Sequence, residues 1–161
     1  MKLLLAALLF SPLAQAEVFT FKNAKGEAVG TATITKKDKG VTIALDLKNL
    51  PAGPHAFHVN QAGKCLAPSF ESAGPHFNPG KSSHGFQSDK GPHAGDFENL
   101  TVKEDGTLQA ELSNERLALG KGKNSLQKKG GTALVIHEKA DDYRSQPAGD
   151  AGARIACAEI K

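Results

Sequence analysis

The chain has 161 residues, a formal net charge of +3 and an aromatic content of 6%. This length is typical of one domain with a core of ordinary size. The charges are dispersed, and no basic surface interleaved with aromatic residues stands out, so we expect no nucleic-acid partner.

The first sixteen residues have the features of an export signal. Lys2 supplies a positive charge, residues 3–10 form an apolar run too short to span a bilayer, and residues 14–16 read Ala-Gln-Ala, a small-residue cleavage motif. An N-terminal core strand is the alternative. Cleavage after Ala16 would leave residues 17–161 as one domain, periplasmic or secreted and without membrane attachment.

Export changes the interpretation of the two cysteines, Cys65 and Cys157. An even number of cysteines in an oxidising compartment favours a disulfide. Two buried free thiols are the alternative.

The mature sequence predicts an all-β fold. In residues 41–48, Val, Ile, Leu and Leu alternate strictly with Thr, Ala, Asp and Lys, which is typical of a half-buried strand. Glycine-containing turns separate further short runs, and no segment keeps a helical period for three turns. The expected strands are 18–22, 28–36, 41–48, 55–59, 96–102, 107–112, 133–137 and 154–160. Eight short strands in a domain of this size indicate a β-sandwich or barrel.

Two long segments interrupt the rhythm of the strands. Residues 61–95 are rich in Gly, Pro, Ser and His, and residues 138–153 are rich in Asp, Gly and Ala. Loops this long in a compact domain are usually functional or disordered, and the histidines favour function for the first loop.

One set of side chains in the first loop suits a metal. Imidazole nitrogens and one carboxylate oxygen are suitable ligands for Zn²⁺ in a closed, structural site. The candidate ligands are His76, His84, His93 and Asp96. Surface histidines in a polar loop are the alternative, and the spacing alone does not decide between them.

A second candidate group lies on strands. Alternation along residues 55–59 places His58 and Asn60 on one face, and His137 ends another expected strand. A histidine at position 60 would have given a pair able to chelate one metal. A single histidine at the end of a strand, such as His137, is more often structural.

Four motifs together resemble the copper/zinc superoxide dismutase family. They are residues 53–59 (GPHAFHV), 72–79 (SAGPHFNP), 134–142 (LVIHEKADD) and 149–157 (GDAGARIAC). Their order and spacing agree with the family over essentially the whole mature chain. The short segment 143–149 resembles the exported bacterial branch. The resemblance implies an eight-stranded Greek-key β-sandwich or barrel with two long functional loops.

The resemblance also implies roles for individual residues. Zinc, as a structural ion, would be bound by His76, His84, His93 and Asp96, and copper would be bound by His58, His76 and His137. Arg154 would hold the incoming superoxide anion. Asp141 would link a copper-side histidine to a zinc-side histidine, and Cys65 and Cys157 would form the intrasubunit disulfide. His55 matches a structural histidine of the family. The family implies a monomer or a homodimer.

Asn60 departs from the family pattern, which has histidine at both ends of the first copper motif. An amide oxygen is a poor donor for copper, so the copper site is expected to be weakened. Two functions therefore remain open. The first is superoxide dismutation at an impaired copper site, and the second is a zinc-only protein that kept the fold without the copper chemistry.

Overall fold

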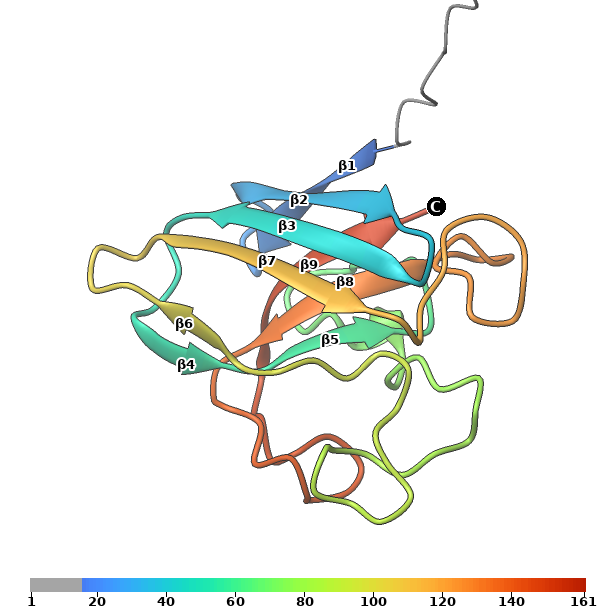
Figure 1. The fold of residues 1–161 in the computed structure, drawn as a ribbon. Coiled ribbons are helices and arrows are strands. Elements are labelled where there is room, and N and C mark those ends of the chain that lie inside the picture. Colours follow the sequence, from blue (N-terminus) through green and yellow to red (C-terminus); the bar gives the residue numbers. More distant parts are fainter. Residues whose placement is uncertain (1–15) are drawn as a thin grey trace, which may run out of the picture.

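The computed structural model describes residues 16–161, so the predicted export signal lies outside the described residues except for Ala16. Nine strands and one short 3-10 helix make up the described part of the chain (Figure 1). The strands are β1 (Ala16–Asn23), β2 (Ala28–Lys36), β3 (Val41–Leu47), β4 (Gly53–His55), β5 (Phe57–Asn60), β6 (Leu100–Val102), β7 (Leu108–Asn114), β8 (Thr132–His137) and β9 (Arg154–Ile160). The helix is η1 (Glu71–Ala73).

Seven strands form one antiparallel sheet in the order β5-β8-β9-β1-β2-β3-β7. The sheet curls into a half-barrel, and the antiparallel pair β4-β6 lies beside it (Figure 1). The all-β prediction is confirmed. Strands far apart in the sequence meet at the β5-β8 edge, which carries two of the candidate metal ligands.

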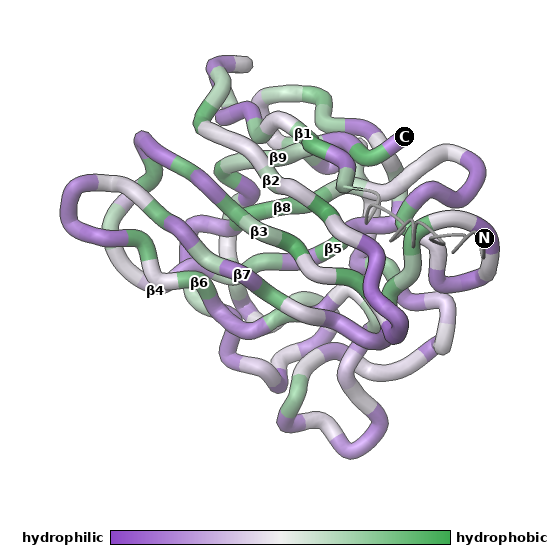
Figure 2. The backbone as a smooth tube through the Cα atoms, turned by 45° about the horizontal axis from the view of Figure 1, so that its top comes forward, coloured by the Kyte–Doolittle hydropathy of each residue, from purple (hydrophilic) through white to green (hydrophobic). Residues whose placement is uncertain are grey.

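The concave side of the sheet holds the main hydrophobic core. Phe21, Ile43, Phe57 and Leu134 are among its fully buried members. Figure 2 shows hydrophobic and hydrophilic residues alternating along β3, whereas the turn after β2 is hydrophilic. In β7 alternate residues are exposed, as period-two patterning requires, whereas every residue of β5 and β8 is buried.

Two expected strands differ from the structure by more than a shift of one or two residues at an end. The expected strand 55–59 is split at Ala56 into β4 and β5, which belong to different sheets. The backbone of Ala56 donates to the Lys139 carbonyl and accepts from the His137 amide, so partners distant in sequence interrupt the strand. The expected strand 96–102 starts only at Leu100.

The two long loops predicted from composition are present, and they pack together below the β5-β8 edge (Figure 1). Residues 61–99 join β5 to β6, and residues 138–153 join β8 to β9. Between residues 16 and 161, no helix is long and apolar enough to cross a membrane.

Candidate metal centre

The long loop 61–99 returns to strand β5 twice. Isolated bridges pair Asn60 with His76 and His58 with Asp96. At Gly95 the approach is so close that a Cβ atom would lie 2.3 Å from the Val59 carbonyl oxygen, so only glycine fits there. The backbone thus brings two loop residues alongside His58, which is fully buried on β5.

Asp96 is the centre of the first group of side chains. Its Oδ1 atom lies 2.9 Å from His76 Nδ1 and 3.2 Å from His93 Nδ1, and its Oδ2 atom lies 3.2 Å from His84 Nδ1. All four side chains are buried. Three imidazole nitrogens gathered around one carboxylate form the donor set predicted for zinc.

His58, His76 and His137 form the second group. Their ring centroids are separated by 3.9 Å for His58–His76, 5.0 Å for His58–His137 and 6.4 Å for His76–His137. Each ring has one nitrogen in a hydrogen bond, to Asp141, Asp96 and the Gly152 carbonyl respectively. Such bonds fix the ring orientation and leave the other nitrogen available to a metal.

The nitrogens that remain are buried and unsatisfied. Buried polar atoms are normally hydrogen-bonded, so several orphans in one place need an explanation. In the part of the chain that the structure describes, the orphaned ring nitrogens are His58 Nδ1, His76 Nε2, His84 Nδ1, His93 Nδ1 and His137 Nε2. Ligand atoms of His58, His76, His84 and Asp96 also lie within 4.8 Å of one another. These side chains therefore fit bound metal.

Asp141 connects the two groups. Its Oδ2 atom lies 2.8 Å from His58 Nε2, and its Oδ1 atom lies 3.0 Å from His84 Nε2. The backbone of Asp141 is held in turn by the Asn99 side chain, which accepts from its amide at 2.8 Å and donates to its carbonyl at 2.9 Å. A Cβ atom at Gly149 would lie 1.8 Å from Asp141 Oδ1, so the second loop packs directly on this carboxylate.

Burial controls the protonation of the second group. Desolvation lowers the pKa of His58 to about 3 and that of His137 to about 4, and it also lowers the pKa of His76. These rings are therefore neutral near pH 7, which is the form that binds metal.

The pKa values of His84 and Asp96, in the first group, are controlled by their contacts, which outweigh burial. Burial lowers the pKa of His84, but the nearby carboxylates of Asp141 and Asp96 outweigh it and raise that pKa to about 9. Burial would raise the pKa of Asp96, yet the close rings of His76, His84 and His93 bring it well below its usual range. A metal bound here would have to displace a proton from His84.

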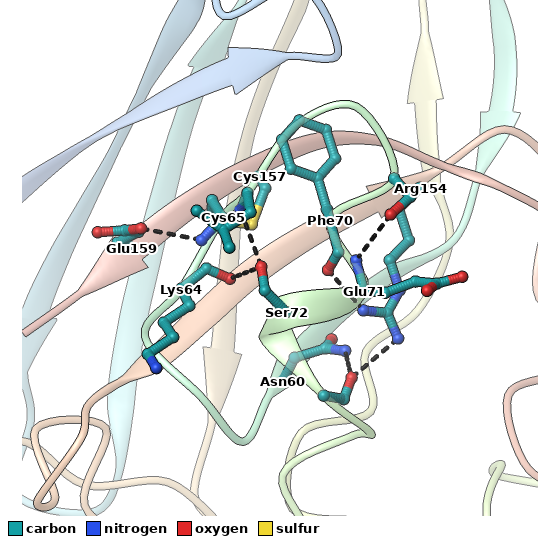
Figure 3. Close-up of a disulfide and its surroundings, with 12 residues drawn as sticks. Asn60, Lys64, Cys65, Phe70, Glu71, Ser72, Arg154, Cys157 and Glu159 are labelled. Carbon is teal, nitrogen blue, oxygen red and sulfur yellow. Dashed lines mark hydrogen bonds between the residues drawn. A yellow bond between two sulfur atoms is a disulfide. The ribbon is translucent and has the colours of Figure 1, made fainter.

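Asn60 lies beside His76 with its side chain fully buried. Its Nδ2 atom donates to the Gly74 carbonyl at 2.6 Å, while its Oδ1 atom is buried and has no partner (Figure 3). The amide nitrogen is therefore committed to the loop. Only an oxygen remains for a ligand, where a histidine would have offered a ring nitrogen.

Arg154 is fixed by the same loop. Its guanidinium donates to the Phe70 carbonyl at 2.7 Å and to the Gly74 carbonyl at 2.8 Å (Figure 3). A hollow of about 670 Å³ reaches Arg154, and a second of about 350 Å³ reaches His137. Gly152 lines both hollows, so the two hollows are neighbours at that residue.

The predicted disulfide is confirmed, because Cys65 and Cys157 are bonded to each other across 92 residues of sequence. It joins the first loop to β9, the strand that Arg154 begins. A small buried cluster packs around it, made up of Phe70, Ala73, Ala133 and Val135.

His55 is buried outside both groups, as the sequence predicts for a structural histidine. Its ring nitrogens lie 2.8 Å from the carbonyl oxygens of His137 and Pro51. Both nitrogens are therefore occupied. Sequence reasoning missed Asn99 and Arg116, which contact the two groups through backbone atoms and carry no motif of their own.

Comparison with known proteins identifies the family. The sequence model for copper/zinc superoxide dismutase (SODC) matches residues 28–160. The chain belongs to the copper/zinc superoxide dismutase family. A copper/zinc superoxide dismutase of Aquifex aeolicus, number 1 of that organism, is 47% identical over 162 residues, covering 98% of this chain and 96% of the relative.

Members of the family with a different name are also similar to this chain. The superoxide dismutase-like protein YojM of Bacillus subtilis is 40% identical over 141 residues, covering 86% of this chain and 72% of the relative. The crystal structure of a superoxide dismutase-like protein from Bacillus subtilis superposes with a TM-score of 0.87 at 38% identity, covering 89% of this chain and 97% of that one. The fold predicted from the motifs is thus confirmed.

Proposed function

We propose that this protein is an exported superoxide dismutase whose copper site is weakened by Asn60. The observation that carries the proposal is the set of buried, unpartnered ring nitrogens on His58, His76 and His137. Burying polar nitrogens without hydrogen-bond partners destabilises a fold, whereas a bound metal would satisfy all three of them.

In this proposal zinc is held by the group around Asp96. The ligands are His76 through Nδ1, His84 through Nδ1, His93 through Nδ1 and Asp96. All four are buried and come from one loop. A closed site of this kind is structural, because four protein ligands leave no open position for water or substrate.

Copper would be held by His58 through Nδ1, by His76 through Nε2 and by His137 through Nε2. When bound, copper supplies the one-electron oxidation and reduction that turn two superoxide anions and two protons into O₂ and H₂O₂. Asp141 orients His58 and His84 together, and Arg154 attracts the superoxide anion to the hollow that it lines. Asn60 adds only a neutral oxygen, so copper binds less tightly than at four nitrogens.

A zinc-only protein without dismutase activity is the second candidate. The observation that favours it is the Asn60 Nδ2 bond to Gly74, which gives the amide a structural role that is independent of copper. The similarity to a relative named as superoxide dismutase-like supports the same reading.

The export signal, with cleavage after Ala16, would place residues 17–161 in the periplasm or outside the cell. The Cys65–Cys157 disulfide supports an oxidising compartment. We infer a monomer or a homodimer that acts on superoxide, with no nucleic-acid partner and no membrane attachment after cleavage.

Metal content and dismutase activity measured on the same reconstituted sample test the proposal. After incubation with both ions and removal of the excess, we expect one zinc per chain, less than one copper per chain, and activity in proportion to copper. Full copper with a normal tetragonal copper spectrum would show that Asn60 does not weaken the site. One zinc per chain with no bound copper and no activity would favour the zinc-only function.

A further inference from the structure

Arg116 contacts the backbone of two predicted zinc ligands at once. Arg116 lies two residues after β7 and is half-buried. Its Nε atom donates to the His93 carbonyl at 3.3 Å, and its Nη2 atom donates to the Asp96 carbonyl at 2.9 Å. These two carbonyls belong to the ends of one turn, in which the His93 amide also donates to Asp96 Oδ2 at 2.9 Å.

The guanidinium also contacts the segment that carries His84. Its Cζ atom lies 5.6 Å from the centroid of the Phe86 ring, two residues after His84. The Phe86 ring packs edge-on against Tyr143 at 5.6 Å, and the Tyr143 hydroxyl accepts from the Asn99 amide at 2.7 Å. One arginine thus contacts both parts of the loop that supply the ligands around Asp96.

Arg116 is itself held in place from β7. Its amide donates to Asn114 Oδ1 at 2.9 Å, and its carbonyl accepts from Asn124 at 2.8 Å. Asn114 Nδ2 donates to the Ala94 carbonyl at 3.0 Å, inside the same turn. The rigid strand therefore fixes the arginine, and the arginine fixes the turn.

We propose that Arg116 is a positioning residue for the zinc site, holding the turn 93–96 so that His93 and Asp96 face the other two ligands. The inference rests on the proposed zinc site. A planar guanidinium suits two acceptors at once, whereas a lysine ammonium is a point charge without that fixed geometry. Removing a group that orients metal ligands typically weakens metal binding by about 10–100-fold.

Competition between the purified protein and a chelator for Zn²⁺ tests the inference. Arg116→Met keeps most of the apolar stem and removes the donors, and Arg116→Lys keeps the charge but not the planar fork. Arg144→Met is the matched control, because Arg144 is exposed and donates to Gln87 without contacting a carbonyl of a predicted ligand. The unfolding free energy of each metal-free variant and the visible spectrum of each Co²⁺-loaded variant are measured in parallel.

We expect Arg116→Met to bind Zn²⁺ about 10–100-fold more weakly, with an altered Co²⁺ spectrum, and Arg116→Lys to lose part of the affinity. Arg144→Met should match the wild type. Unchanged Zn²⁺ affinity and Co²⁺ spectrum in Arg116→Met, with only the metal-free stability reduced, would overturn the positioning role. If Arg116→Met does not fold, wild-type affinity in Arg116→Lys would overturn it instead. A wild-type protein that binds no Zn²⁺ would overturn the proposed zinc site and this inference together.

Discussion

Residue 60 has an amide beside His76 and two residues after His58, and both of these histidines have a free, buried ring nitrogen. The Asn60 side chain is held in one orientation, because its Nδ2 atom donates to the Gly74 carbonyl that also accepts from Arg154. The amide nitrogen of Asn60 is used in the bond to the loop, so only the amide oxygen is left for a metal. We therefore expect Asn60 to affect copper and not zinc, since Asn60 is not a member of the group around Asp96.

Asp141→Asn should weaken the binding of both metals. A carboxylate accepts from His58 and His84 together, whereas an amide has only one acceptor oxygen for these two rings. We expect zinc affinity to fall by about 10–100-fold, measured by chelator competition. Asp142→Asn is the control, because the exposed Asp142 carboxylate accepts hydrogen bonds only from Arg144 and Ser145. Equal zinc affinity in Asp141→Asn and wild type would exclude this role.

The metal-free protein should be most stable near pH 6.5. His58 and His137 have lowered pKa values of about 3 and about 4, so their contribution is present above 6.5 and lost as the pH falls through those values. His84 has a raised pKa of about 9, so its contribution is present below 6.5 and lost as the pH rises through 9. Thermal unfolding in the presence of a chelator, from pH 4 to pH 9, measures this. A melting temperature that increases as the pH is lowered from 6.5 to 4 would contradict these assignments.

At the scale of the elements, period-two patterning predicted most strands because their faces are set by local alternation. The interruption at Ala56 could not be predicted, since its partners Lys139 and His137 are about eighty residues away in sequence. The same limit applies to Arg116 and Asn99, whose contacts depend on how β7 and the long loops pack. Ligand types were visible in the composition of the loop, but their grouping required the family motifs.

The disulfide should hold the first loop against β8 and β9. It closes a segment spanning 92 residues, and loss of such a bond typically costs about 2–5 kcal/mol of unfolding free energy. We expect the Cys65→Ser, Cys157→Ser double variant to show this loss in denaturant titration and faster amide exchange across residues 61–75. Ser69→Ala, an exposed change in the same loop, should leave both unchanged. Wild-type exchange rates in the double variant would mean that the buried cluster around Phe70 holds the loop by itself.

For the molecule as a whole, the half-barrel sheet supplies a rigid edge, the loop 61–99 supplies most of the predicted ligands, and the loop 138–153 supplies Asp141. The strands β5 and β8 contribute His58 and His137, while the loop 61–99 contributes the group around Asp96. The disulfide and the family membership agree with the proposed dismutase outside the cytoplasm. Among the predicted ligand positions, Asn60 departs from the pattern that the resemblance implies.

The comparison of wild type with Asn60→His tests this account most directly. Both proteins are loaded with zinc and copper, and copper per chain and dismutase activity are measured on the same samples. We predict that Asn60→His binds more copper and gains activity, because a ring nitrogen replaces an amide oxygen, while zinc content stays the same. No gain in activity in Asn60→His at full copper occupancy would contradict the claim that residue 60 is the limiting defect.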